Sequence, residues 1–417
     1  KWKPRYSYAN KRESLDVQGG TKSTVTMSLR ARKNPKVGRH CRVEILLNNM
    51  VDIDVQAMLL PLNAIQTITC CPKYRIKYDY ITPNSLVSNF VSLILTVFLV
   101  LTYVFRVCVV YFDKTKLTRL LSNSAYSDFI FYGVGLTMNF IVGVVYTKMN
   151  TSFVLSVQNI HRFLLDNSSF KRIITWNWIH SIFFVILHGS TFFFFCFLME
   201  THYYYLNNYV IVAFDINIVY AFRMIHLLEN YAVLWNNRAF KLREIDADDE
   251  IYCDKMFETY VDIMKCYEMY RICFQYYVIY YVLEMGTHIL FYVEIAIQSC
   301  VYYVSDGENI EALKTVNSIN TWLVKNMLLQ GILSYNCENF YKALENIQDT
   351  CEKITTSATT TKDDKKRLYK NVQRLHRAAF TKISACGLFY VDAALSLNMV
   401  TFLSNYIVVL LQFAFLT

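Results

Sequence analysis

Long apolar stretches recur along the 417-residue chain, and charged or strongly polar positions separate them. A helix of roughly 20 apolar residues crosses a bilayer core about 30 Å thick, because each residue adds 1.5 Å. Seven stretches reach this length, and the sixth is the weakest because it contains Lys325 and several amides. They cover residues 86–105, 129–147, 173–199, 201–222, 272–300, 315–337 and 393–417. The pattern therefore predicts an all-α membrane protein with seven transmembrane helices.

Lys and Arg residues are distributed unevenly between the predicted loops. The N-terminal segment and the loops after spans two, four and six hold 35 of them, whereas the loops after spans one, three and five hold 5. Basic loops remain in the cytoplasm during membrane insertion. We therefore expect a cytoplasmic N-terminus and an extracellular C-terminus, the reverse of the orientation of a G-protein-coupled receptor.

The chain outside the spans divides into segments of different character. Residues 1–49 are basic and lack a helical apolar period, which predicts a disordered tail. Residues 50–85 are better organised and predict a cytoplasmic or interfacial segment, and residues 86–417 form the transmembrane domain. Helical apolar spacing continues outside the spans within 227–271 and 338–386, so we expect cytoplasmic helical extensions there.

Composition removes several classes of function. Only 18% of the residues are charged and 54% are hydrophobic, whereas soluble domains carry about 25% charged residues. The net charge of +9 arises ahead of the first span, where it is a topology signal rather than a nucleic-acid-binding arm. The sequence contains no phosphate-binding glycine loop and no GxSxG or HExxH motif, and we expect neither an enzyme nor a cofactor or metal site. No internal repeat is visible, which disfavours a secondary transporter.

The C-terminal region contains a recognisable motif. The sequence ACGLFYVD occupies residues 385–392, and NYIVVLLQF occupies residues 405–413 within the last span. The second segment resembles the signature of insect gustatory receptors, in which Thr-Tyr, five hydrophobic residues and Gln-Phe close the seventh helix. Asn405 replaces the Thr, whereas Tyr406, Gln412 and Phe413 match. The wider resemblance covers roughly residues 50–417.

Three shorter segments bear on the subfamily. MLLPLN at 58–63, KYRI at 73–76 and ITPN at 81–84 are similar to moth receptors of the bitter or plant-compound class. Ile407 stands where sugar-class members tend to carry Glu. The resemblance therefore favours a bitter or deterrent receptor over a sugar receptor.

What the resemblance implies is a ligand-gated, non-selective cation channel of the plasma membrane. Its ligand would be a small plant-derived tastant, and Na⁺, K⁺ and Ca²⁺ would permeate. Four identical subunits would surround one pore lined by their seventh helices, and assembly with co-receptor subunits is the open alternative. The other partner would be membrane lipid, and no nucleic acid would be bound. The extensions 227–271 and 338–386 would form the anchor of the tetramer. A secondary transporter and a seven-helix G-protein-coupled-type receptor remain the alternatives.

The last span offers candidate pore residues. By the resemblance, Gln412 and Phe413 form or adjoin the narrowest level of the pore, and Val408, Val409 and Leu416 line the neighbouring levels. A Gln amide both donates and accepts hydrogen bonds, so four copies can link across an axis. The competing interpretation is an ordinary bundle helix with one hydrogen-bonded Gln.

Three charged residues lie near the midpoints of predicted spans: Asp215, Glu284 and Lys325. A charge in hydrocarbon is costly, so these side chains should face the bundle interior and pair. We expect Lys325 to pair with Asp215 or with Glu284, and direct or indirect contact with a ligand is the alternative.

The outer halves of spans two to six supply candidate ligand residues. A mixture of aromatic rings and few polar anchors suits a small, moderately apolar compound. For each residue, packing or an interfacial aromatic belt is the competing interpretation. The candidates are Tyr132, His188, Phe192, Tyr205, Tyr209, His288, Tyr292, Trp322 and Asn326.

Overall fold

A computed structural model describes residues 49–112, 116–164, 167–199, 204–244, 250–306, 310–357, 363–385, 387 and 389–416, and several side chains near helix ends are not described. The predicted tail, residues 1–49, lies outside this part of the chain except for Asn49. The described elements are helical apart from four short strands. In chain order they are α1 (Ile53–Ile68), β1 (Arg75–Lys77), β2 (Tyr80–Thr82), α2 (Leu86–Phe112), α3 (Lys116–Val144), α4 (Thr147–Leu164), α5 (Asn167–Met199), α6 (Tyr204–Glu244), α7 (Glu250–Asp306), α8 (Ile310–Ser357), α9 (Asp363–Ala379), β3 (Ser384–Ala385), β4 (Phe389–Tyr390) and α10 (Ala393–Leu416).

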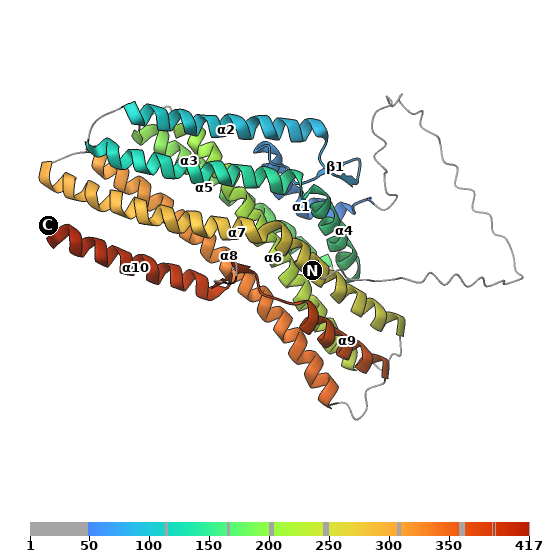
Figure 1. Ribbon diagram of the computed structural model, residues 1–417. Coiled ribbons are helices and arrows are strands. Elements are labelled where there is room, and N and C mark those ends of the chain that lie inside the picture. Colours follow the sequence, from blue (N-terminus) through green and yellow to red (C-terminus); the bar gives the residue numbers. More distant parts are fainter. Residues whose placement is uncertain are drawn as a thin grey trace, which may run out of the picture. The chain divides into compact units, whose positions relative to one another are not determined.

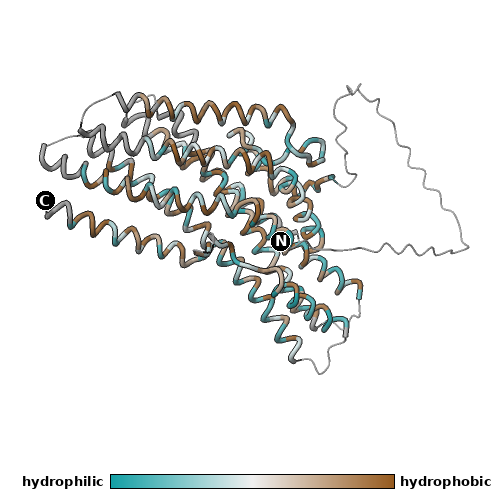
Figure 2. Tube along the Cα trace, in the orientation of Figure 1, coloured by the Kyte–Doolittle hydropathy of each residue, from teal (hydrophilic) through white to brown (hydrophobic). Residues whose placement is uncertain are grey.

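Six helices contain a segment long and apolar enough to cross a membrane. Such segments occur in α2, α3, α5, α6, α7 and α10, within the described residues. They are Leu86–Phe105, Tyr126–Val144, Lys171–Phe193, Ile211–Leu242, Glu250–Gln298 and Ala393–Gln412. Hydrophobic residues follow the same parts of these helices in Figure 2. The prediction of an all-α, multi-pass membrane protein is confirmed.

The predicted sixth span, 315–337, lies in α8 and is not one of these six segments. The difference arises because this segment contains the polar residues Lys325, Asn326, Gln330 and Ser334, and all four are buried. They face neighbouring helices rather than lipid, because α8 packs against α6, α7 and α10. These polar residues lower the mean hydropathy of α8, and their burial keeps their polar atoms away from hydrocarbon.

Helices α6, α7 and α8 are much longer than a bilayer requires. They have 41, 57 and 48 residues, against roughly 20 for one crossing. Their ends continue past the start of α10 and form a second, more polar bundle with α9 (Figures 1 and 2). Within the extensions expected at 227–271 and 338–386, the described residues 227–244, 250–271, 338–357 and 363–379 are helical, and their role as an anchor stays a prediction.

Hydrogen bonds from aromatic side chains hold this second bundle together. The indole of Trp235 in α6 donates to the carbonyl of Met256 in α7 at 2.8 Å. The hydroxyl of Tyr369 in α9 donates to the carbonyl of Ala239 in α6 at 3.0 Å. Both groups are buried, so each bond satisfies a polar atom within an apolar core.

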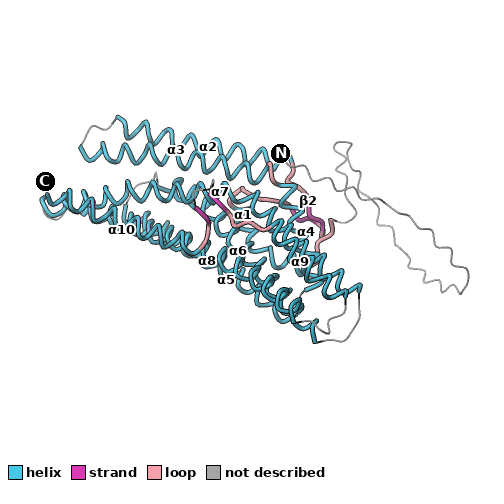
Figure 3. The backbone as a smooth tube through the Cα atoms, turned by 60° about the horizontal axis from the view of Figure 1, so that its bottom comes forward, coloured by secondary structure: helices cyan, strands magenta, loops and turns pink. Residues whose placement is uncertain are grey.

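The segment between residues 50 and 85 contains α1 and a two-stranded antiparallel hairpin of β1 and β2 (Figure 3). Lys73, just before β1, is buried against α6 and α7. Its Nζ atom donates to Asn217 Oδ1 at 2.6 Å and lies 5.3 Å from the ring centres of Tyr220 and Phe274. Burial lowers the pKa of Lys73 to about 8. These contacts fix the segment to α6 and α7.

One helix lies where the sequence pattern predicts a loop. The predicted loop after span two covers residues 148–172, but α4 occupies most of this region. Val154, Val157 and Ile160 on one side of α4 are buried, and α4 packs against α7. Arg162 pairs with Asp52 at 2.7 Å, which holds the pKa of that carboxyl below its usual value.

Candidate functional site

Charged side chains from four helices lie inside the transmembrane bundle. Asp128 comes from α3, Asp215 from α6, Glu284 and His288 from α7, and Lys325 from α8. Each of these residues is between 0% and 6% exposed, so bulk water does not solvate their charges. Ionisable groups at this depth are costly and are retained for pairing or for function.

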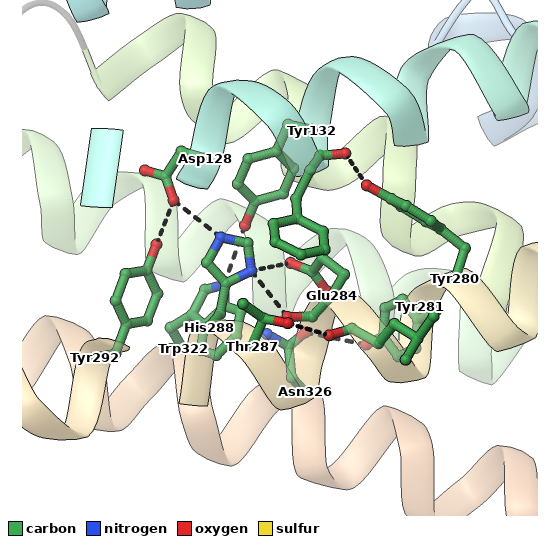
Figure 4. A network of polar contacts seen from close by, with 12 residues as sticks. Asp128, Tyr132, Tyr280, Tyr281, Glu284, Thr287, His288, Tyr292, Trp322 and Asn326 are labelled. Carbon is green, nitrogen blue, oxygen red and sulfur yellow. Dashed lines mark hydrogen bonds and ion pairs between the residues drawn. The ribbon is translucent and has the colours of Figure 1, made fainter. Parts of the chain in front are cut away.

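His288 lies between two carboxylates (Figure 4). Its Nε2 atom is 3.0 Å from Asp128 Oδ1, and its Nδ1 atom is 2.9 Å from Glu284 Oε1. Carboxyl oxygens therefore face both ring nitrogens of His288, one from α3 and one from α7. The hydroxyl of Tyr292 donates to the same Asp128 oxygen at 2.9 Å.

Four aromatic rings surround the His288 ring. The centre-to-centre distances are 5.3 Å for Phe131, 5.5 Å for Tyr132, 5.3 Å for Tyr292 and 5.5 Å for Trp322. Rings at this distance stabilise a cation through their quadrupoles. We call Asp128, Glu284 and these four rings the His288 cage.

A second ion pair lies inside the bundle. Lys325 in α8 donates to Asp215 Oδ2 in α6. Of the two partners left open by the sequence, the structure joins Lys325 to Asp215, whereas Glu284 pairs with His288. His188 in α5 has its Nε2 atom 3.4 Å from the same Asp215 oxygen, without a hydrogen bond among the described residues.

Four of the predicted ligand residues lie together, with His288 at the centre of the cage and Tyr132, Tyr292 and Trp322 around it. Asn326 lies beside them and accepts a hydrogen bond from Tyr281 at 3.0 Å. His188 faces Asp215 instead.

The remaining predicted ligand residues are not part of the cage as described. Phe192 is 39% exposed on α5. The side chains of Tyr205 and Tyr209 lie outside the described residues. Asp128 and Phe131 were missed, although an acidic residue directly at the end of an uncharged span was a usable signal for Asp128.

Helix α7 has two adjacent stripes with different neighbours. Glu284, His288 and Tyr292 recur every fourth residue and face the cage. Met285, Ile289 and Val293, each one residue further on, form an apolar cluster against α10. Residues spaced by four share one face of a helix, and a step of one residue turns by 100°. The same helix therefore contacts the cage and α10.

Helix α10 is attached to the bundle on one side only. Met399, Leu403, Ile407 and Leu410 pack against the α7 cluster, and only 6% of the α10 span is buried. The opposite face is exposed and includes Thr401, Asn405, Val408 and Gln412.

Of the predicted pore residues, Val408, Val409 and Gln412 are exposed on α10. The side chains of Phe413 and Leu416 lie outside the described residues. Among the described residues, no group of three or more His, Cys, Asp and Glu residues has the geometry of a metal site.

No protein-family model matches the sequence, and no curated protein is similar enough in sequence to match. The fold does match solved structures of the insect olfactory receptor OR5 from Machilis hrabei. The structure with bound eugenol superimposes with a TM-score of 0.57 at 11% identity, and the structure determined without it gives 0.58 at 12%. Each alignment covers 86% of this chain and 99% of the receptor chain. The chain therefore has the fold of this insect olfactory receptor over nearly the whole of the described region.

Proposed function

We propose that the protein is a subunit of a ligand-gated, non-selective cation channel that acts as a gustatory receptor for a small plant-derived tastant. The His288 cage is the observation on which this proposal rests. A membrane protein that needed only stability would fill this space with apolar side chains, because a buried ion network is often no more stable than well-packed hydrophobic residues. The shared fold with an olfactory receptor whose structure contains eugenol supports a chemosensory role.

The ligand would be held in the outer part of the bundle. Tyr132, His288, Tyr292, Trp322 and Asn326 are the candidates that cluster in the structure. His188, Phe192, Tyr205 and Tyr209 stay proposed members of the same pocket. The segments that resemble plant-compound receptors favour a bitter or deterrent ligand over a sugar.

Helix α10 would line the pore. Its exposed face carries Asn405 and Gln412, two side-chain amides that lipid would leave without hydrogen-bond partners. A water-filled axis formed by four copies satisfies these groups, which is why a homotetramer is proposed. Val408, Val409, Phe413 and Leu416 would then supply apolar levels that close the pore by dewetting.

Gating would pass through α7. A ligand that changes the contacts of His288 and Tyr292 would turn or tilt the helix that carries them. Ile289 and Val293 on the neighbouring stripe would transmit that movement to α10. One continuous helix, α7, then connects the ligand site to the pore. Coupling between two sites requires a physical connection of this kind.

The second bundle, formed by 227–271 and 338–386, would anchor the tetramer in the cytoplasm. The anchor role is what the resemblance implies, and the basic loops support its cytoplasmic location because they favour an N-terminus inside and a C-terminus outside. The plasma membrane would be the site of action, and Na⁺, K⁺ and Ca²⁺ would permeate.

Expression of this chain alone in a heterologous cell tests the proposal. Whole-cell recording would compare alkaloids, plant glycosides, plant steroids and sugars, and a C-terminal tag stained on intact cells would verify expression and orientation. We expect an inward cation current with one or more plant compounds. A correctly displayed protein that gives no current with any class would contradict channel function. A response to sugars alone would contradict the bitter assignment, and current only with a second receptor subunit would contradict the homotetramer.

A further inference from the structure

Arg223 is a buried cation in α6 that lacks an acidic partner. It is 5% exposed, and its Nε atom donates to Asn177 Oδ1 in α5 at 2.7 Å. Within the part of the chain that the structure describes, no carboxylate lies within ion-pair distance of the guanidinium, and its Nη groups have no hydrogen-bond partner. Arginine carries most of its donors on these two nitrogens. An unpaired buried charge is costly, so this guanidinium favours an anion supplied from outside the chain.

Lys73 is also buried without an acidic partner among the described residues, but its charge is covered in another way. Its Nζ atom donates to Asn217 Oδ1 at 2.6 Å and lies 5.3 Å from the ring centres of Tyr220 and Phe274. An amide and two aromatic faces together stabilise an ammonium group. Arg223 has only the amide of its neighbour in α5, so of these two cations it is the one left to pair.

His180 in α5 lies beside Arg223 and is half-buried. Its ring centre is 5.9 Å from that of Phe222, the residue before Arg223. Its Nδ1 atom is 2.7 Å from the carbonyl oxygen of Trp176, so Nδ1 donates a hydrogen bond there. The Nε2 atom has no partner among the described residues and is available to an anion that pairs with Arg223.

The next acid along α6 is already engaged. Glu229 pairs with His226 at 2.8 Å. It follows Arg223 by six residues in the sequence, which places it about 9 Å further along the helix axis. A neighbouring carboxylate on the same helix therefore does not neutralise Arg223.

An exposed apolar stripe leads away from this point along α5. Trp176, Ile179 and Phe183 are exposed and recur every three or four residues, so they share one face of the helix. We call these three residues the α5 stripe. The ring centre of Trp176 is 5.7 Å from that of His180, which places the stripe directly beside the basic groups. An apolar surface of this kind on a membrane span contacts acyl chains.

Arg223 and the start of the α5 stripe belong to the same end of the predicted spans. Arg223 directly follows the predicted fourth span, 201–222, and Trp176 lies about one turn into the predicted third span, 173–199. In the predicted orientation both points are near the cytoplasm. The cytoplasmic leaflet contains anionic phospholipids, and basic groups between membrane helices on that side bind their headgroups. A phospholipid therefore supplies both an anion for Arg223 and chains for the stripe.

We propose that Arg223 and His180 bind the phosphate group of an anionic phospholipid in the inner leaflet, while its acyl chains follow the α5 stripe. The Nη groups of Arg223 donate to the phosphate oxygens. His180 donates through Nε2, because an anion beside the ring favours its protonated form. The site is separate from the proposed tastant pocket, and its existence does not depend on channel function.

Asn177 connects this site to α1. Its Oδ1 atom accepts the hydrogen bond from Arg223, and its Nδ2 atom donates to the carbonyl oxygen of Met58 at 2.7 Å. A lipid that fixes the guanidinium therefore also fixes the contact between α1 and α5. Since a ligand that binds only the folded state stabilises it, the lipid should raise the midpoint of thermal unfolding.

Compounds that each lack one part of a phospholipid provide the test. Dioleoylphosphatidylserine has two chains and an anionic headgroup, dioleoylglycerol has the same chains without a phosphate, and glycerol 3-phosphate has the phosphate without chains. Each would be titrated onto the purified, delipidated full chain in a neutral detergent. Native mass spectrometry would measure bound lipid and its dissociation constant, and thermal unfolding would record the shift of the midpoint.

Four variants would be compared with the wild type. Arg223→Gln removes the charge, Arg223→Lys keeps the charge without the planar fork, and His180→Gln removes the second donor. Arg374→Gln removes a positive charge at an exposed position on α9, outside the spans, and is the control. We expect phosphatidylserine to bind the wild type and to raise its midpoint. Arg223→Gln should raise the dissociation constant by about tenfold or more, Arg223→Lys and His180→Gln should raise it less, and Arg374→Gln should leave it unchanged.

Three results would overturn the site. Equal binding of dioleoylglycerol and phosphatidylserine would show that only the chains contact the protein. Equal stabilisation by glycerol 3-phosphate would assign the site to a soluble phosphate, and equal affinity of Arg223→Gln and the wild type would remove Arg223 from the contact. If Arg223→Gln does not fold, the comparison of the two dioleoyl lipids on the wild type and the dissociation constant of His180→Gln decide the question. None of these measurements uses an ion current, so their outcome is independent of the proposed function.

Discussion

His288 and Ile289 are consecutive in the sequence but contact different parts of the protein. The imidazole of His288 lies between Asp128 and Glu284 inside the bundle, whereas Ile289 is fully buried in the cluster between α7 and α10. A shift of the His288 side chain therefore acts on the backbone segment that also positions Ile289. We expect the proposed ligand site and the proposed pore helix to be coupled through this pair.

Shortening Ile289 should weaken that coupling without removing the ligand site. Ile289→Ala deletes apolar contact between α7 and α10, so the same ligand occupancy should open fewer channels. We expect the half-maximal concentration to rise by about fivefold or more, with ligand affinity of the purified protein nearly unchanged. Leu283→Ala, at an exposed position on the same helix, is the control. Equal loss of current in both variants would show that the Ile289 contact has no special part in gating.

We expect substitutions of Lys325 and Asp215 to have strongly non-additive effects on stability, because the two side chains form a buried ion pair. Removal of either partner leaves a buried charge alone, at a cost of about 3–5 kcal/mol. Lys325→Met and Asp215→Asn should each reduce surface expression and the midpoint of thermal unfolding in detergent, and the double variant should recover much of the loss. The exposed pair of Lys265 and Asp262, 3.2 Å apart, offers a control in which the coupling should be close to zero. Additive defects at Lys325 and Asp215 would argue against their pairing.

Two glycines on α3 form a matched test of packing. A Cβ atom at Gly135 would overlap the ring of Phe214 and lie 3.3 Å from Tyr280, whereas Gly133 has nothing within 4 Å. Gly135→Ala should therefore lower the free energy of unfolding by about 1–3 kcal/mol. Gly133→Ala should be neutral or stabilising, because Ala favours a helix more than Gly does. Thermal unfolding of the two purified variants checks the difference, and equal midpoints would contradict the close approach of α3 and α6.

The spans could be predicted from the sequence because lipid imposes a long apolar run on each helix. Six of these runs appear as candidate spans in the structure. Helix α8 is less apolar because it contains polar residues such as Lys325 and Asn326, which the bundle can accommodate in its interior. Helix α4 was not predicted because its apolar residues are interspersed with polar ones, and their packing against α7 is visible only in the structure. The hairpin of β1 and β2 was missed because Tyr78 and Asp79, both with positive φ, replace the Gly-containing turns that mark such hairpins.

The candidate site was only partly predictable for a different reason. Charge and aromatic character on apolar spans identified His288, Glu284, Tyr292 and Trp322 one by one. Their partners could not be deduced, since Asp128 and His288 are 160 positions apart and no local pattern relates two helices at that separation. The choice of Asp215 over Glu284 as the partner of Lys325 likewise depends on how α6 and α8 pack.

Replacement of Gln412 tests whether the exposed face of α10 lines the pore. Gln412→Ala removes a donor and an acceptor from the proposed axis, so basal current or relative permeability to Na⁺, K⁺ and Ca²⁺ should change at normal surface expression. Leu411→Ala, one position away and turned by 100°, should have a smaller effect. Unchanged permeability in Gln412→Ala would remove this residue from the pore wall.

Reconstitution of the purified chain in a planar lipid bilayer tests the account most directly, because no other protein is present. Addition of a plant compound that evokes current in whole cells, to the side that the C-terminus faces, should evoke discrete cation currents, and the same addition to a bilayer without protein should evoke none. Purified protein that binds the compound but conducts no ions in the bilayer would contradict the central claim that this chain is itself a ligand-gated channel.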